Sequence, residues 1–126
     1  DENNIDFFAY SPLSFGILCI DPDKEQNKEK SFIRNALFEN YKKPTYELRR
    51  CLKRIANQRS VSQAQVAINW CCYQGAIPLV GMRKKSQVID VSNVFKWNLN
   101  KNEFKVLQEV SKKCLKKMPK NPFSSN

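Results

Sequence analysis

Apolar residues in this chain recur mostly at intervals of three and four positions, the spacing of one face of an α-helix. Five segments show this spacing and are predicted to be helical: residues 32–37, 44–55, 62–74, 86–95 and 100–115. Polar residues that favour helix starts stand at the beginning of the last three, namely Ser62, Ser86 and Asn100. Gln65 completes a capping-box pattern with Ser62, and Gly75 is expected to end that helix.

Two short apolar runs, at residues 5–9 and 76–80, lack the helical spacing and predict buried strands. Because helical segments separate them, the two strands should pair in parallel. A parallel pair needs further strands and cover on both faces, and two strands alone leave unpaired edges. The pattern therefore predicts an α/β chain whose residues 1–126 form a single incomplete domain. Within it, residues 19–30 read as an acidic loop and residues 119–126 as a loose tail.

Charge is unevenly distributed along the chain. Residues 1–29 hold seven acidic and two basic side chains, whereas the whole chain has a net charge of +10. The residues after position 29 are therefore strongly basic, and such a surface attracts phosphate, nucleic acid or an anionic membrane. However, 16 of the 22 basic residues are Lys, and specific phosphate or base recognition relies more on Arg. A solvated basic surface with no specific nucleic-acid partner is the favoured interpretation.

A nucleic-acid-binding module stays open as an alternative because lysines cluster near the C-terminus. These are Lys112, Lys113, Lys116, Lys117 and Lys120. Aromatic residues do not alternate with them, and no nucleic-acid-binding motif fits the segment.

Cysteine and histidine content limits the chemistry. There are five Cys and no His, which excludes a Cys/His zinc site and a His-dependent nucleophilic triad. The three glycines form no phosphate-binding loop, and no apolar run approaches the roughly 18 residues that span a bilayer. We expect a reduced, cytoplasmic chain with buried thiols, no metal site and no catalytic residue of its own.

The ends of the two predicted strands carry the candidate chemistry. The second strand runs into Gly81, Arg83 and Lys84, and a helix starts directly afterwards. A helix N-terminus with nearby cations suits a phosphate. An ordinary capped helix preceded by an exposed basic turn explains the same residues, so the residues alone leave both interpretations open.

Three segments, in order and at matching spacing, resemble the aldo-keto reductase family. They are residues 8–18, residues 62–70 and residues 77–90, and the similarity continues to Trp97 and Leu99. The resemblance implies the C-terminal part of a (β/α)8 TIM barrel, with strands seven and eight as two short parallel strands and about five helices. The most similar branch includes the potassium-channel β subunits and the bacterial general-stress reductases.

The resemblance also implies that this segment binds NADP. Tyr10 would stack on the nicotinamide ring. Ser11 and Leu13 would place backbone and hydroxyl groups at the pyrophosphate, and Gly16 would allow close backbone approach.

The other end of NADP would lie at the second strand end. Gly81 and Arg83 would hold the 2′-phosphate, an arrangement that favours NADP over NAD. Gln87 would touch the same end of the cofactor, and Asp90 would hydrogen-bond the adenine.

The family's activity would be the reduction of aldehydes or ketones by hydride transfer. Its catalytic Asp, Tyr, Lys and His come from earlier barrel strands, so this chain would supply cofactor binding only. Whether the chain serves an enzyme is left open, and a non-catalytic relative that senses nicotinamide or scaffolds a partner is the alternative. Two positions depart from the family: Asp21 replaces a Lys that clamps the pyrophosphate, and Val91 replaces an Asn beside the adenine-binding carboxylate.

Overall fold

The computed structural model describes residues 6–24 and 39–117. The elements in chain order are β1 (Phe7–Tyr10), η1 (Ser14–Cys19), α2 (Tyr46–Arg59), α3 (Gln63–Tyr73), β2 (Ala76–Leu79), α4 (Lys85–Ser92), η2 (Asn93–Lys96) and α5 (Lys101–Leu115). Four of the five predicted helices are confirmed, and the one expected at residues 32–37 lies outside the described residues. None of the described helices is both long and apolar enough to cross a membrane.

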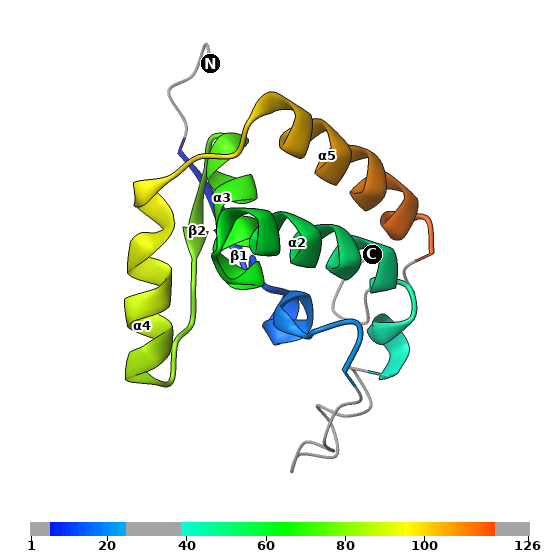
Figure 1. Ribbon diagram of the computed structural model, residues 1–126, viewed down its shortest axis with the longest axis horizontal. Helices are drawn as coiled ribbons and strands as arrows, with labels where there is room; N and C mark the ends of the chain where they lie inside the picture. The colour runs from blue at the N-terminus through cyan, green and yellow to red at the C-terminus, as the bar shows by residue number, and fades with distance from the viewer. Residues whose placement is uncertain (1–5, 25–38, 118–126) are drawn as a thin grey trace.

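The two strands form a parallel pair, as predicted. Phe7 lies opposite Ala76 and Tyr10 opposite Leu79, so both strands leave the sheet at the same end. The helix α3 packs against the sheet beside β2, and α2 packs against α3 (Figure 1). This mixed arrangement is consistent with part of a (β/α)8 barrel.

The prediction that the strands are buried is wrong: no residue of β1 or β2 is buried, and Phe7 is 69% exposed on the face opposite Tyr10. Paired residues in a parallel sheet point to the same side, which places Phe8, Tyr10, Ile77 and Leu79 on one face. Their exposed fractions run from 43% for Ile77 to 87% for Tyr10. The helix α3 contacts the sheet, but no described element covers this apolar face, which is why its side chains reach solvent.

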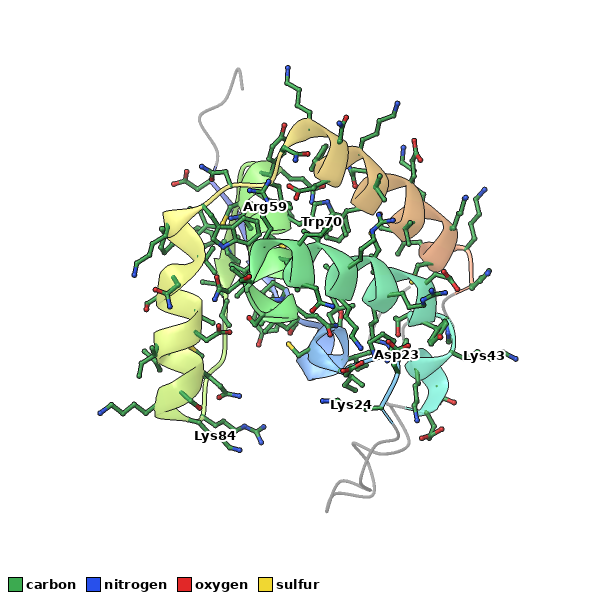
Figure 2. The ribbon with its side chains drawn as sticks, in the orientation of Figure 1. Asp23, Lys24, Lys43, Arg59, Trp70 and Lys84 are labelled. Atoms are coloured by element: carbon green, nitrogen blue, oxygen red, sulfur yellow. The ribbon has the colours of Figure 1, made fainter. Side chains whose placement is uncertain are left out.

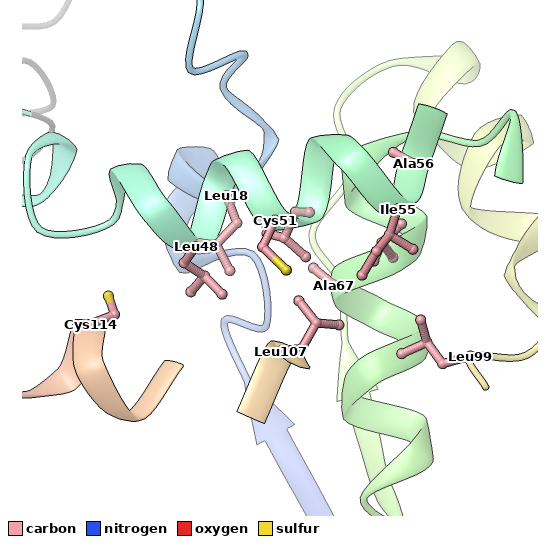
Figure 3. Close-up of a cluster of buried hydrophobic side chains, with 11 residues drawn as sticks. Leu18, Leu48, Cys51, Ile55, Ala56, Ala67, Leu99, Leu107 and Cys114 are labelled. Atoms are coloured by element: carbon pink, nitrogen blue, oxygen red, sulfur yellow. The ribbon is translucent and has the colours of Figure 1, made fainter. Parts of the chain in front are cut away.

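The hydrophobic core lies where α2, α3 and α5 meet (Figure 3). One residue from each helix is completely buried: Leu52 from α2, Val66 from α3 and Leu107 from α5. Burying a side chain of this size stabilises the fold by about 1.5–3 kcal/mol. The periodic positions identified in the sequence therefore build the helical layer that supports the strands.

Helix α4 and the segment after it are exceptions to the predicted pattern. Val88, Ile89 and Phe95 occupy apolar positions of the predicted helix, yet they are 49%, 56% and 85% exposed. No residue of α4 is buried, and only Val94 in η2 is. The apolar spacing correctly predicted that this segment is helical. It did not predict that the apolar side chains are exposed, which follows because α4 lies at the margin of the described structure (Figure 1).

Local capping signals are borne out around α3 and α5. The Ser62 hydroxyl accepts a hydrogen bond from the backbone N–H of Gln65 at 3.1 Å. Asn100 and Glu103 cap α5 reciprocally, with each side chain accepting from the other's backbone N–H at 2.8–2.9 Å. Gly75 follows the end of α3 with a φ of 78°, a conformation that glycine adopts without a steric penalty.

Two buried amides on α3 hold the segment that joins α4 to α5. The Asn69 amide donates to the carbonyl oxygens of Trp97 at 2.8 Å and Val94 at 3.3 Å, and accepts from the N–H of Leu99 at 3.0 Å. One turn earlier, the Gln65 carbonyl oxygen accepts from the Trp97 indole at 3.1 Å. Both amide residues are 4% exposed. The capping-box pattern predicted that the Gln65 side chain would accept from the Ser62 backbone N–H. In the structure its amide makes the contact with Trp97 instead.

The expectation of buried thiols holds for part of the set. All five cysteines are free; Cys51 and Cys114 are buried, whereas Cys19 is exposed. Burial raises the pKa of the Cys51 and Cys114 thiols, which keeps them protonated and unreactive near neutral pH.

An ion pair joins the end of α2 to the start of α5. The Arg59 guanidinium donates to both carboxylate oxygens of Glu103, at 2.9 and 2.8 Å. It also lies 5.7 Å from the centre of the Trp97 ring. The hydrogen bond from Arg59 holds the pKa of Glu103 below its ordinary value of about 4.5. The same carboxylate caps α5, so one side chain serves both the helix start and the helix–helix contact.

The first prediction concerns the buried Asn69 amide. Replacement Asn69→Ala leaves the Leu99 N–H and two carbonyl oxygens without their partner, so we expect a loss of about 2–3 kcal/mol in the free energy of unfolding. Urea denaturation followed by circular dichroism measures this. The matched control is Asn57→Ala on the exposed side of α2, which should change stability by less than about 0.5 kcal/mol. Equal effects of the two variants would contradict the role assigned to Asn69.

The second prediction concerns pH. Because the pKa of Glu103 is lowered in the folded chain, the stability it contributes is fully present above its unfolded pKa and is lost as pH falls through the folded pKa. Glu103→Gln keeps an acceptor for the cap but removes this titration. The wild-type advantage over Glu103→Gln should therefore shrink as pH falls from about 7 to about 3, measured by urea midpoints. A difference independent of pH, or an equal shift in the exposed control Glu109→Gln, would rule out the assignment.

Candidate functional site

The candidate site begins where the two parallel strands end. Since Tyr10 pairs with Leu79, the segments that follow the strands leave the sheet side by side. Tyr10 is 87% exposed on the uncovered face of the sheet. The structure thus brings together the two strand ends that the sequence analysis singled out.

The turn after β1 has an unusual backbone. Ser11, Ser14 and Phe15 have φ values of 50°, 47° and 57°, and Gly16 has a φ of 93°. The Ser14 N–H donates to the Ser11 carbonyl at 2.9 Å, which closes the turn. Non-glycine residues rarely adopt positive φ, and such conformations concentrate at functional sites.

Leu13 sits at the centre of this turn and connects it to the core. Its side chain packs against the buried cluster. Its carbonyl oxygen accepts from the N–H of Gly16 at 2.9 Å, while its own N–H makes no hydrogen bond within residues 6–24 and 39–117. The turn therefore presents one backbone donor on a well-anchored residue.

The turn between β2 and α4 is organised by Gln87. Its side-chain oxygen accepts hydrogen bonds from the backbone N–H of Arg83 at 2.8 Å and of Lys84 at 3.0 Å. The prediction that Ser86 caps this helix is wrong: α4 begins at Lys85, and the Gln87 side chain folds back to supply the cap. A residue inside the first turn can take over this role because its side chain reaches the preceding N–H groups.

Two donors and two cations remain at this helix start. The N–H groups of Lys85 and Ser86 have no hydrogen-bond partner in the part of the chain that the structure describes. The side chains of Arg83 and Lys84 are exposed, and no described carboxylate pairs with them. Lys84 projects from the end of α4 that is remote from the helical layer (Figure 2). This positive helix end can accept an anionic group.

Gly81 precedes these cations without any local requirement for glycine. Its φ lies outside the left-handed region, and a side-chain carbon built there would have no neighbour within 4 Å. The missing side chain leaves the surface of the turn open above the backbone.

Asp90 lies on α4, and its side chain contacts the start of α3. One carboxylate oxygen accepts from the Ser62 hydroxyl at 2.5 Å and the other from the Gln65 side-chain amide at 2.7 Å. Sequence reasoning identified Ser62 and Gln65 only as a helix cap and missed that they bind Asp90. Each carboxylate oxygen can still accept a further hydrogen bond. Val91, beside it, is half-buried.

Asp21, the position that departs from the family pattern, is turned toward α2. Its carboxylate accepts from the Lys53 ammonium at 2.6 Å, and Lys53 also binds Asp23 at 2.8 Å. Lys24 lies 3.8 Å from the second oxygen of Asp21. The hydrogen bond from Lys53 lowers the pKa of Asp21, which is therefore ionised and neutralised locally. No sequence signal pointed to Lys53, because it lies 32 residues further along the chain.

Comparisons with known proteins match most of the chain. A family model described as the aldo/keto reductase family matches residues 1–112. A chloroplastic pyridoxal reductase from Arabidopsis thaliana is 31% identical over 125 residues, which cover 99% of this chain and 34% of the relative. A Saccharomyces cerevisiae protein named as a putative aryl-alcohol dehydrogenase is 22% identical over 113 residues, which cover 88% of this chain and 33% of the relative. The chain thus spans about a third of the length of the curated relatives it matches.

The third prediction tests how α4 is held. Asp90→Ala removes the acceptor of the Ser62 hydroxyl and of the Gln65 amide, which we expect to destabilise the fold by about 1–2 kcal/mol. Because no α4 residue is buried, amide hydrogen exchange in α4 should accelerate more than exchange in α2. The control Glu109→Ala removes an equal charge from the exposed side of α5. Unchanged exchange in α4 of Asp90→Ala would show that other contacts hold this helix.

Proposed function

The chain belongs to the aldo/keto reductase family, and we propose that it forms the cofactor-binding part of an NADP-dependent oxidoreductase. The proposed reaction is hydride transfer from NADPH to an aldehyde or ketone. The observation that carries the proposal is the shared direction of the two strand ends. They present an exposed aromatic ring from β1 and an uncompensated basic turn from β2 at one end of the sheet.

The residues after β1 fit the nicotinamide and pyrophosphate end of the cofactor. The Tyr10 ring offers a flat apolar face for the nicotinamide. The N–H of Leu13 and the hydroxyl of Ser11 would donate to the pyrophosphate, and Gly16 keeps the turn close to it. Asp21 does not oppose this arrangement, because Lys53 neutralises its charge on the side of α2.

The residues after β2 fit the adenosine end. Arg83 would hold the 2′-phosphate together with the free N–H groups at the start of α4, and Gly81 leaves room for that phosphate. The Gln87 side-chain oxygen accepts from the N–H groups of the turn. Its NH2 group would donate to the same end of the cofactor. Asp90 would accept from the adenine amino group while it stays bound to α3.

The cofactor supplies the hydride, and this chain's own residues bind and orient it. Residues 1–126 would act as one incomplete domain, and the family's catalytic groups would supply the proton for the carbonyl. The substrate is a small carbonyl compound whose identity these residues do not specify. The exposed apolar face of the sheet favours self-association when the chain is alone.

The fourth prediction separates NADP from NAD. Arg83→Ala should weaken NADPH binding about ten- to a hundredfold, since a charge-assisted hydrogen bond contributes about 1.5–3 kcal/mol. Binding of NADH, which lacks the 2′-phosphate, should change by less than about threefold. Cofactor fluorescence titration measures both, on this chain or on a longer protein that contains it.

The matched control for this titration is Arg50→Ala, which removes the same charge from the exposed surface of α2. Equal losses of NADPH and NADH affinity in Arg83→Ala would reject the 2′-phosphate assignment. Tight NADPH binding without turnover of any carbonyl compound in the complete protein would favour the sensing or scaffolding alternative.

A further inference from the structure

A groove of about 880 Å³ lies between the turn before α2 and the last turns of α5. Five cationic side chains line it: Lys42, Lys43, Arg49, Lys113 and Lys117. Lys43 projects from the turn before α2 (Figure 2). Among the described residues two carboxylates share the lining, those of Glu39 and Glu47, and Glu39 lies 3.9 Å from the Lys42 ammonium. The groove is therefore positive, and it uses none of the strand-end residues.

Arg49 differs from the other cations because it is buried. It is 2% exposed. Its Nε donates to the Thr45 hydroxyl at 3.3 Å and its Nη2 to the Lys42 carbonyl at 2.7 Å. Both acceptors are neutral, and no carboxylate within residues 6–24 and 39–117 forms an ion pair with it. The Tyr46 ring, 5.9 Å from the guanidinium carbon, and the charge of Asp21 offset the burial of this cation, but desolvation outweighs them and lowers the pKa of Arg49. A buried charge that is only partly compensated is costly, so this guanidinium can bind an anion.

The start of α2 adds backbone donors to the same groove. Thr45 stands at the N-cap position but does not cap the helix, because its hydroxyl donates to the Tyr41 carbonyl at 2.6 Å. The N–H groups of Glu47 and Leu48 consequently make no hydrogen bond within the described residues. Uncapped N–H groups at a helix start favour an anion through both hydrogen bonds and the helix dipole.

We propose that this groove binds a small oxyanion, a phosphate or carboxylate group, with Arg49 as its central ligand. The remaining guanidinium nitrogen, Nη1, makes no hydrogen bond to a described residue, and a guanidinium can present two parallel N–H groups to an oxyanion. The lysines at the groove supply long-range attraction, and Lys113 and Lys117 also offset the negative end of α5. The site is independent of cofactor binding at the strand ends.

The experiment measures thermal stability and ³¹P NMR line width of the chain with inorganic phosphate, at constant ionic strength set with chloride. At about 100 times the dissociation constant, phosphate should raise the melting temperature by roughly 5–10 °C. Arg49→Met removes the buried charge and keeps an unbranched apolar stem. It leaves the Lys42 carbonyl without the Arg49 donor, which lowers the baseline stability, and it should lose both the phosphate-dependent rise and the line broadening. Arg50→Met, one position along α2 and exposed, is the matched control and should keep both.

A parallel titration with succinate identifies the chemistry of the natural anion. Binding of phosphate alone indicates a phosphorylated ligand, and binding of both indicates a general oxyanion site that also accepts a carboxylate. Either result supports the proposal if Arg49→Met abolishes it. No effect of either anion, or an equal rise in wild type and Arg49→Met, would overturn it, because the second outcome is the general stabilisation that phosphate gives through exclusion from protein surfaces.

Discussion

The buried amides of Gln65 and Asn69 are the constraint on which the second half of the structure depends. They lie one turn apart on the same side of α3. Between them they bind three backbone groups and the Trp97 indole of the segment that follows α4. An N–H or C=O group buried away from water needs a hydrogen-bond partner. These hydrogen bonds therefore fix the path of the chain between α4 and α5. Apolar side chains at these two positions would pack but would not select that path.

This polar constraint extends to the candidate site. The same Gln65 amide binds Asp90, and Ser62 binds its other oxygen, so α4 is tied to the start of α3 through a carboxylate. Helix α4 buries no residue of its own. The position of the basic turn that carries Arg83 therefore depends on hydrogen bonds from one end of α4 and on the sheet register at the other, and little on hydrophobic packing.

Donors without a described partner occur at both candidate sites, and the buried Trp70 indole N–H is a further one outside them. At the strand ends, a turn with positive φ values and a helix start with free N–H groups face the same end of the sheet. At the other site, the buried Arg49 guanidinium and the uncapped start of α2 open into a positive groove. Other charges are paired within the chain, as in the Arg59–Glu103 pair and the Asp21–Lys53 pair. A buried donor without a partner is costly, so a group bound at either candidate site would stabilise the fold.

The sequence by itself determined the elements and their order. Helices α2, α3 and α5, the caps at Ser62 and Asn100 and the two parallel strands follow from local spacing and from residues within one turn of each other. The sequence also singled out the two strand ends, and the parallel register brings them to one end of the sheet. Tertiary structure alone decided the exposure of the sheet face and of α4, the partners of Asp90 and Asp21, and the burial of Arg49. The physical reason is that the burial of a side chain depends on what packs against it, and the partners of Asp90 and Asp21 lie 25 to 32 residues away along the chain, where no local pattern records them.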